Sequence, residues 1–184
     1  MLNVPNMVMI GGNSRNSGKT TMACSIIGKL SVTEDVIGLK VTSICPGEDD
    51  FHGHHTEDES SGFSIFEELN PGSDKDTSRM LRAGSSHVYY IRVSEELIEK
   101  TLLHFLSTYI NKQLIVCESR SLRGIINPGL FLMMMRLPAV NKRKDVAAYL
   151  TLADRVFYFD EDQDARKQFV DSLSFTEGKF SQIN

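Results

Sequence analysis

Short apolar runs alternate along the chain with segments whose apolar residues recur at helical spacing. The apolar runs predict strands at residues 7–10, 36–41, 87–93, 114–117, 130–135 and 155–159, with a further short candidate at 63–67. The helical spacing predicts helices at residues 19–30, 77–83, 95–109, 142–152 and 164–173. This alternation with short connections predicts an α/β fold, a three-layer α/β/α domain with a mainly parallel sheet.

One long segment, around residues 43–74, interrupts this pattern. It is rich in Gly, Ser, His and acidic residues and contains Pro46 and Pro71. A stretch of this length without regular structure is typically functional or mobile. We therefore expect one domain over residues 1–184 that carries a mobile loop insertion around 43–74.

Three histidines, His52, His54 and His55, lie close together in this insertion among acidic residues. Such a tract can bind zinc or another metal ion. A polar loop that closes over a substrate explains the same composition. The sequence favours the closing loop but leaves the metal site open.

The composition is that of an ordinary globular protein, with 41% hydrophobic and 24% charged residues and a formal net charge of −4. The negative charge argues against a nucleic-acid partner, which calls for a basic face. The three cysteines are far apart in the sequence and suit a reducing compartment. No leader pattern and no long apolar run is visible, so we expect a cytoplasmic protein without membrane association.

Residues 7–21, MVMIGGNSRNSGKTT, have the layout of a strand, a glycine-rich loop and a helix start. In a phosphate-binding loop, backbone N–H groups and the helix N-terminus face an anion, Lys19 reaches the outer phosphates and the Thr20 hydroxyl ligates Mg²⁺. A lysine at a helix start is unfavourable beside the helix dipole unless an anion is present. The predicted nucleotide-binding residues of this stretch are Gly12, Asn13, Asn16, Ser17, Gly18, Lys19, Thr20 and Thr21.

The loop departs from the usual pattern, G-x-x-x-x-G-K-[ST], at one position. That pattern would have glycine where this chain has Asn13, and Gly12 stands one residue too early. Two interpretations remain open: Asn13 adopts the positive φ of a glycine, or the loop has an extra residue after Gly12.

Two carboxylates are candidates for metal binding. Glu118 follows the strand at 114–117, at the edge of the sheet where ligands bind in open α/β folds, and can hold Mg²⁺ or orient a water molecule. Asp76 precedes the helix at 77–83, where it can act as an N-cap, a metal ligand or both.

Three cations are candidates for binding a substrate phosphate or carboxylate. Lys40 stands near the end of the second strand, and Arg79 and Arg82 are three apart on one helix. A solvated helix face paired with nearby acids explains the two arginines equally well.

The choice of nucleobase is not written in the sequence. Asp160, after the strand at 155–159, is a candidate base-reading residue. Residues 141–145, NKRKD, only superficially match the guanine-reading N-K-x-D, because the aspartate comes one residue late. ATP and GTP therefore both remain candidates.

Three further stretches resemble MobB-type proteins, the nucleotide-binding adapters of molybdopterin-guanine dinucleotide biosynthesis. They are GLKV at 38–41, KDTSRMLRAGSS at 75–86 and LIVCES at 114–119. This resemblance implies a P-loop NTPase domain, typically a homodimer, that presents a bound nucleotide to a partner enzyme.

The chain is also similar to dethiobiotin synthetase. That enzyme has five residues between the first glycine and GKT, as this chain has after Gly12, and a lysine comparable with Lys40. The resemblance implies Mg²⁺ ligation by Thr20, Asp76 and Glu118. Both families favour glycine where this chain has Ser119, so the reaction itself is not carried over.

The function expected from the sequence is Mg²⁺-dependent binding of ATP or GTP, with hydrolysis or phosphoryl transfer to an unidentified small acceptor. Lys19 and Glu118 are the expected catalytic residues, in metabolism of the cofactor-biosynthesis type. The alternative is a MobB-like adapter with little catalysis of its own, and the resemblance to that family allows for a homodimer.

Overall fold

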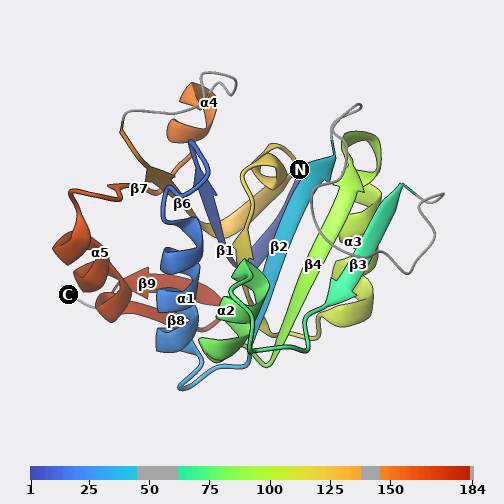
Figure 1. Ribbon diagram of the computed structural model, residues 1–184, viewed down its shortest axis with the longest axis horizontal. Coiled ribbons are helices and arrows are strands. Elements are labelled where there is room, and N and C mark those ends of the chain that lie inside the picture. Colours follow the sequence, from blue (N-terminus) through green and yellow to red (C-terminus); the bar gives the residue numbers. More distant parts are fainter. Residues whose placement is uncertain (45–61, 138–145, 183–184) are drawn as a thin grey trace.

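The computed structural model describes residues 1–44, 62–137 and 146–182, and a seven-stranded sheet forms its centre (Figure 1). The strand order is β3-β4-β2-β5-β1-β6-β7, and every neighbouring pair is parallel except β3 and β4. The predicted α/β class and mainly parallel sheet are confirmed. The strands are β1 (Leu2–Gly12), β2 (Val36–Ile44), β3 (Phe63–Glu67), β4 (His87–Ser94), β5 (Leu114–Glu118), β6 (Ile126–Met135) and β7 (Arg155–Tyr158).

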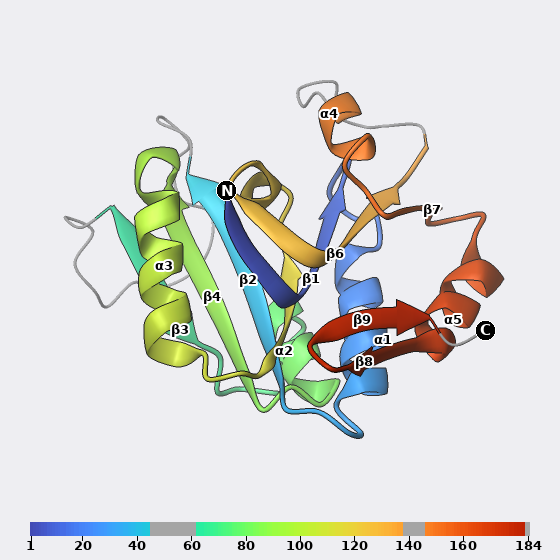
Figure 2. The same ribbon diagram turned by 180° about the vertical axis from the view of Figure 1, so that it is seen from behind.

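Helices flank this sheet on both faces (Figures 1 and 2). Buried side chains of α1 (Lys19–Leu30), α2 (Asp76–Arg82) and α5 (Gln163–Ser172) belong to the core on one face. The core on the other face receives α3 (Ile98–Tyr109), the 3-10 turn η3 (Ser121–Gly124) and, more peripherally, α4 (Ala147–Leu150).

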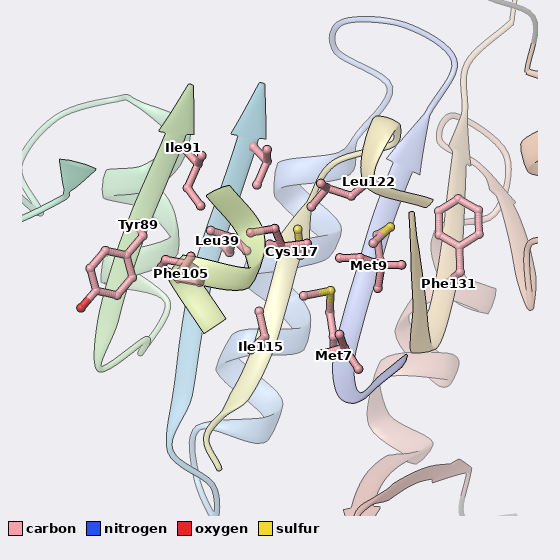
Figure 3. Packing of buried hydrophobic residues seen from close by; sticks show 14 of the residues in the cluster. Met7, Met9, Leu39, Tyr89, Ile91, Phe105, Ile115, Cys117, Leu122 and Phe131 are labelled. Atoms are coloured by element: carbon pink, nitrogen blue, oxygen red, sulfur yellow. The ribbon is translucent and has the colours of Figure 1, made fainter. Parts of the chain in front are cut away.

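The two cores follow from the alternation of side chains along each strand. On β1, Met7 and Met9 enter one core while Val8 and Ile10 enter the other, and all four are fully buried. Figure 3 shows Met7 and Met9 on the same face of the sheet as Phe105 of α3. Because helices cover both faces, the central strands are apolar on both sides over most of their length, which explains the uninterrupted apolar runs.

The core on the α3 face of the sheet contains an aromatic contact between α3 and β4. The rings of Tyr89 and Phe105 meet edge to face, with centroids 5.2 Å apart. A 3-10 turn, η2 (Glu95–Leu97), precedes α3, and Ser94 flanks it without a side-chain capping hydrogen bond. The helix predicted at 95–109 is therefore real, but it begins with a tighter turn.

The C-terminal end contains a hairpin that the apolar pattern did not predict. Helix α5 ends at Ser172, and β8 (Leu173–Thr176) pairs with β9 (Lys179–Gln182). Glu177 and Gly178 both have positive φ, as in a two-residue hairpin turn of the primed type. The strands are too short for a clear period-2 pattern, so the dipeptide Glu-Gly was the only local signal.

Two predictions fall partly outside the described residues. The helix predicted at 142–152 is observed only as α4, and residues 142–145 are not described. His52, His54 and His55 and most of the insertion around 43–74 also lie outside the described residues, although β3 within it confirms the short strand expected at 63–67. Within the described ranges, no helix is long and apolar enough to cross a membrane.

Candidate functional site

The glycine-rich loop, residues 12–18, joins the carboxyl end of β1 to the first residue of α1. Strand β1 lies between β5 and β6, and the chain leaves β1 and β5 toward opposite faces of the sheet, through α1 and η3. Such a switch point opens a crevice at the carboxyl ends of the strands, which is where ligands bind in open α/β sheets. The residues predicted from the sequence converge on this edge.

Two glycines allow the loop to close tightly. Gly18 flanks α1 with φ of 88°, and a Cβ atom there would lie 2.0 Å from Cδ2 of Phe159. A Cβ atom on Gly12 would lie 2.4 Å from Oγ of Ser17, whose side chain is fully buried. The loop also bends at Asn16, which has φ of 60°. Glycine at both positions is therefore a requirement of the loop's shape.

Asn13 does not take the place of the missing glycine. Positive φ in this loop occurs at Asn16 and Gly18, so the first interpretation of Asn13 is wrong. Its buried side chain instead pairs with the backbone of Arg136: Nδ2 donates to the carbonyl oxygen at 2.9 Å, and Oδ1 accepts from the amide at 3.0 Å. Asn13 thus continues the pairing of β1 and β6 with its side chain. The second interpretation, a loop with an extra residue after Gly12, therefore remains.

The side chain of Lys19 folds back over the loop. Its Nζ donates to the carbonyl oxygen of Ser14 at 2.8 Å and to Oγ of Ser17 at 3.5 Å. Burial lowers the pKa of Lys19, the neighbouring Glu118 carboxylate raises it, and the positive charge of Lys40 lowers it further. A partly desolvated cation held over the loop is poised to receive an anion.

The Thr20 hydroxyl and the Glu118 carboxylate form the centre of the site. Thr20 Oγ1 donates a 2.7 Å hydrogen bond to Glu118 Oε2, and both side chains are buried. In the sheet register, Glu118 is paired with Ile10 of β1 on one side and with Lys40 of β2 on the other. The parallel register therefore brings the end of β5 against the start of α1 and places Lys40 Nζ 3.9 Å from Glu118 Oε1.

Asp76 lies beside this pair but is not the N-cap of α2. The N-cap position belongs to Lys75, and Asp76 is the first helical residue. Its Oδ2 receives the ammonium group of Lys40, and its Oδ1 lies 3.7 Å from Nη1 of Arg79. Burial raises the pKa of Asp76, but the hydrogen bond and charge of Lys40, the Thr20 hydroxyl and Arg79 together lower it below its ordinary value.

The two arginines of α2 have different surroundings. Arg79 Nη2 donates to Oγ1 of Thr21 at 3.3 Å, so it bridges α2 to the start of α1. Arg82 Nη1 donates to the carbonyl oxygens of Pro71 and Ser73 in the loop that precedes the helix. Of the three predicted cations, Lys40 and Arg79 lie in the site, whereas Arg82 holds a neighbouring loop.

A second group of side chains covers the other side of the loop. Arg136 donates from Nη1 to the carbonyl oxygen of Asn16 at 3.2 Å, and its Nε lies 3.2 Å from Oδ2 of Asp160. Phe159 lies against Gly18, with the guanidinium carbon of Arg166 4.8 Å from its ring centroid. Asp160 is thus linked to the glycine-rich loop through its ion pair with Arg136. Arg136 follows a predicted strand directly, and that strand-end position was the signal that sequence reasoning overlooked.

The donor set at this edge suits Mg²⁺. Mg²⁺ takes a hydroxyl or one or two carboxylates and keeps the rest of its shell for water and phosphate oxygens. Thr20 and Glu118 offer that combination, with Asp76 close by through Lys40. Within the described ranges, no group of three or more His, Cys, Asp or Glu side chains could enclose a metal ion.

Comparison of the chain with protein-family models, curated proteins and solved structures gives no match. The class of protein therefore rests on the architecture: a mostly parallel α/β sheet flanked by helices, consistent with a Rossmann- or P-loop-like fold. The resemblances to MobB-type proteins and to dethiobiotin synthetase stay predictions.

Proposed function

We propose that the glycine-rich loop binds the phosphates of ATP or GTP with Mg²⁺, and that the protein hydrolyses the nucleotide or transfers its terminal phosphoryl group to a small acceptor. The observation that carries this proposal is the buried hydrogen bond between Thr20 and Glu118, 2.7 Å long, directly after Lys19. A hydroxyl and an ammonium group at the start of α1, together with a carboxylate at the end of β5, form the donor set that a magnesium–phosphate group requires.

The start of α1 supports phosphate binding in a second way. The first turn of α1 contains no acidic residue, so no side chain of that turn neutralises the positive end of the helix dipole. Lys19 adds its charge at the same place, where its partners are a carbonyl and a hydroxyl oxygen. Backbone N–H groups of residues 16–20 and the Lys19 ammonium group would hold the outer phosphates.

Thr20 and Glu118 would hold the metal ion, with Asp76 as a further carboxylate. When bound, Mg²⁺ neutralises part of the charge that develops on the phosphate oxygens. Lys19 stabilises that charge electrostatically, and Glu118 orients the attacking water or acceptor hydroxyl. Such a site works mainly by positioning, because phosphoryl transfer asks little covalent chemistry of the protein.

The acceptor would bind beside Lys40 and Arg79. Both cations face the carboxylate of Asp76, and an anionic acceptor could exchange for part of that pairing. Arg82 does not belong to this proposed subsite, because its guanidinium group is committed to the carbonyl oxygens of Pro71 and Ser73.

Thermal-shift titration with ATP, GTP and ADP, with and without Mg²⁺, tests the nucleotide site. We expect one nucleoside triphosphate with Mg²⁺ to stabilise the wild type by about 2.7 kcal/mol at a concentration one hundred times its Kd. Lys19→Ala should abolish this stabilisation, whereas Lys29→Ala, an exposed lysine at the other end of α1, should preserve it. If no nucleotide stabilises the wild type, the proposal is wrong.

The resemblance of residues 75–86 and 114–119 to MobB-type proteins favours a second candidate, an adapter that binds nucleotide with little turnover. Steady-state phosphate release separates the two functions. An enzyme should release phosphate at a rate that falls about a hundredfold in Glu118→Gln while nucleotide-dependent stabilisation survives. An adapter should bind nucleotide but release phosphate no faster than Lys19→Ala does.

A further inference from the structure

Arg120 carries a positive charge at the carboxyl edge of the sheet and belongs neither to the glycine-rich loop nor to the proposed metal site. It follows Glu118 and Ser119 at the carboxyl end of β5 and directly precedes η3. Its Nη1 atom is buried and has no hydrogen-bond partner in the described part of the chain. Its guanidinium carbon lies 5.2 Å from the centroid of the Tyr149 ring on α4.

A buried N–H group without an acceptor is unusual, because it loses its hydration without replacement. Arginine cannot relieve this cost by losing its proton. An anion bound beside this N–H group would supply the missing acceptor.

The stacking on Tyr149 gives Arg120 a defined orientation. A guanidinium group whose face lies over an aromatic ring keeps its N–H edge free for a planar, forked contact with two oxygens. The neighbouring Arg123 also has a buried nitrogen, Nε, without a partner in the described residues, but it differs in position, because its Nη1 donates at 3.0 Å to the carbonyl oxygen of Ile126, at the opposite end of the sheet from the loop. Arg123 therefore supports the start of β6, whereas the unmatched donor of Arg120 belongs to a residue at the carboxyl end of β5, two positions after Glu118.

We propose that Arg120 binds the outermost phosphoryl group of the nucleotide held by the glycine-rich loop, so that the site distinguishes a triphosphate from a diphosphate. This inference rests on the proposed function and adds a residue to it. Arg120 would reach this group from the carboxyl end of β5, whereas Lys19 would reach it from the start of α1. Tyr149 is the positioning residue that holds the guanidinium group.

Isothermal titration calorimetry with Mg²⁺–diphosphate and Mg²⁺ with the β,γ-imido triphosphate analogue tests the inference, using whichever base the wild type binds. We expect Arg120→Gln to weaken the triphosphate analogue about tenfold, the loss of one charge-assisted hydrogen bond, and to leave the diphosphate Kd within about twofold. The Kd of Arg120→Lys for the triphosphate analogue should lie between those of the wild type and Arg120→Gln, because lysine retains the charge but cannot make the forked contact. Tyr149→Phe should bind both nucleotides as the wild type does, and Tyr149→Leu should lose part of the preference for the triphosphate analogue over the diphosphate.

Each alternative outcome has a distinct meaning. An unchanged ratio of the two dissociation constants in Arg120→Gln overturns the inference and leaves the nucleotide site standing. Equal weakening of both nucleotides together with a lower Tm indicates a structural role and also overturns it. If the wild type binds neither nucleotide, the proposed function itself is wrong, and the inference falls with it.

Discussion

The Thr20 hydroxyl at the start of α1 donates a 2.7 Å hydrogen bond to the Glu118 carboxylate at the end of β5, although the two residues are 98 positions apart. Both side chains are buried, and Lys40 Nζ lies 3.9 Å from the other carboxylate oxygen of Glu118. The sheet register causes this proximity, because Ile10 and Lys40 flank Glu118 on its two neighbouring strands.

Replacing Thr20 by valine removes the hydroxyl while preserving the shape of the side chain. We expect Thr20→Val to lower the free energy of unfolding by about 1–3 kcal/mol, because the buried carboxylate of Glu118 loses its donor. Thr20→Ser should retain most of the stability. Thr21→Val, at the exposed neighbouring position, should change the stability by less than about 0.5 kcal/mol. Urea unfolding of the four proteins measures the differences, and equal losses at both threonines would contradict the assignment.

Replacing Asn13 by the glycine of the usual phosphate-loop pattern should lower the free energy of unfolding. Asn13→Gly removes both hydrogen bonds to the backbone of Arg136, and we expect a loss of about 1–3 kcal/mol. Asn16→Gly is the matched control, because Asn16 already has φ of 60°, so glycine there should be neutral or mildly stabilising. Chemical denaturation shows whether the two substitutions differ as expected; a stabilising Asn13→Gly would contradict the role of the side chain.

Two glycines of α1 and its loop should respond oppositely to alanine. Gly18→Ala combines φ of 88° with a clash against the Phe159 ring, and we expect a loss of more than about 2 kcal/mol. Gly28→Ala should gain up to about 1 kcal/mol, because Gly28 is helical and a Cβ atom there would lie at an ordinary 3.6 Å from the carbonyl oxygen of Ala83.

A double-mutant cycle separates the two causes at Gly18. Phe159→Ala combined with Gly18→Ala should recover the part of the loss that comes from the clash, while the backbone strain persists. Thermal or urea unfolding of the single and double variants gives the coupling. Strict additivity of the two substitutions would show that the ring does not limit position 18.

The ion pair of Lys40 and Asp76 should make stability depend on pH in acid. The pKa of Asp76 is lowered in the folded protein, so its contribution is fully present above its ordinary value of 3.8 and is lost as the pH falls through the folded pKa. The stability difference between wild type and Asp76→Asn should therefore be constant from about pH 5 to pH 8, at less than about 1 kcal/mol for this partly exposed pair, and shrink below about pH 4.

Urea unfolding of the wild type and Asp76→Asn at pH 3, 4, 5 and 7 measures this dependence. Asp74→Asn is a suitable control, because Asp74 is exposed in the loop before α2. A difference between wild type and Asp76→Asn that grows on acidification would contradict the assigned direction of the pKa shift.

Much of the fold could be predicted because local patterns determine it. The helix at 19–30 was predicted with its observed bounds, and buried strands such as β5 are recognisable in the sequence as continuous apolar runs. The hairpin of β8 and β9 could not be predicted, because its strands are only four residues long and their pairing depends on one turn with positive φ at Glu177 and Gly178. Its aromatic pair, Phe175 and Phe180, meets only after the turn has formed.

The candidate site was predictable residue by residue but not as a set of contacts. Strand ends and helix starts identify Lys40, Asp76 and Glu118, because those positions face one edge of a parallel sheet. The sequence does not separate Arg79, which contacts Thr21, from Arg82, which holds the preceding loop. Arg120 is likewise inconspicuous until the burial of its Nη1 atom is known.

The sequence by itself determined the α/β class, the glycine-rich loop before α1 and the polar residues at the strand ends, because each depends on residues within a few positions of one another. Only the tertiary structure decided the strand order, the pairing of Thr20 with Glu118 and the use of Asn13 as a substitute strand partner for Arg136. These contacts join residues about a hundred or more positions apart, and their geometry follows from sheet register, which no local pattern specifies.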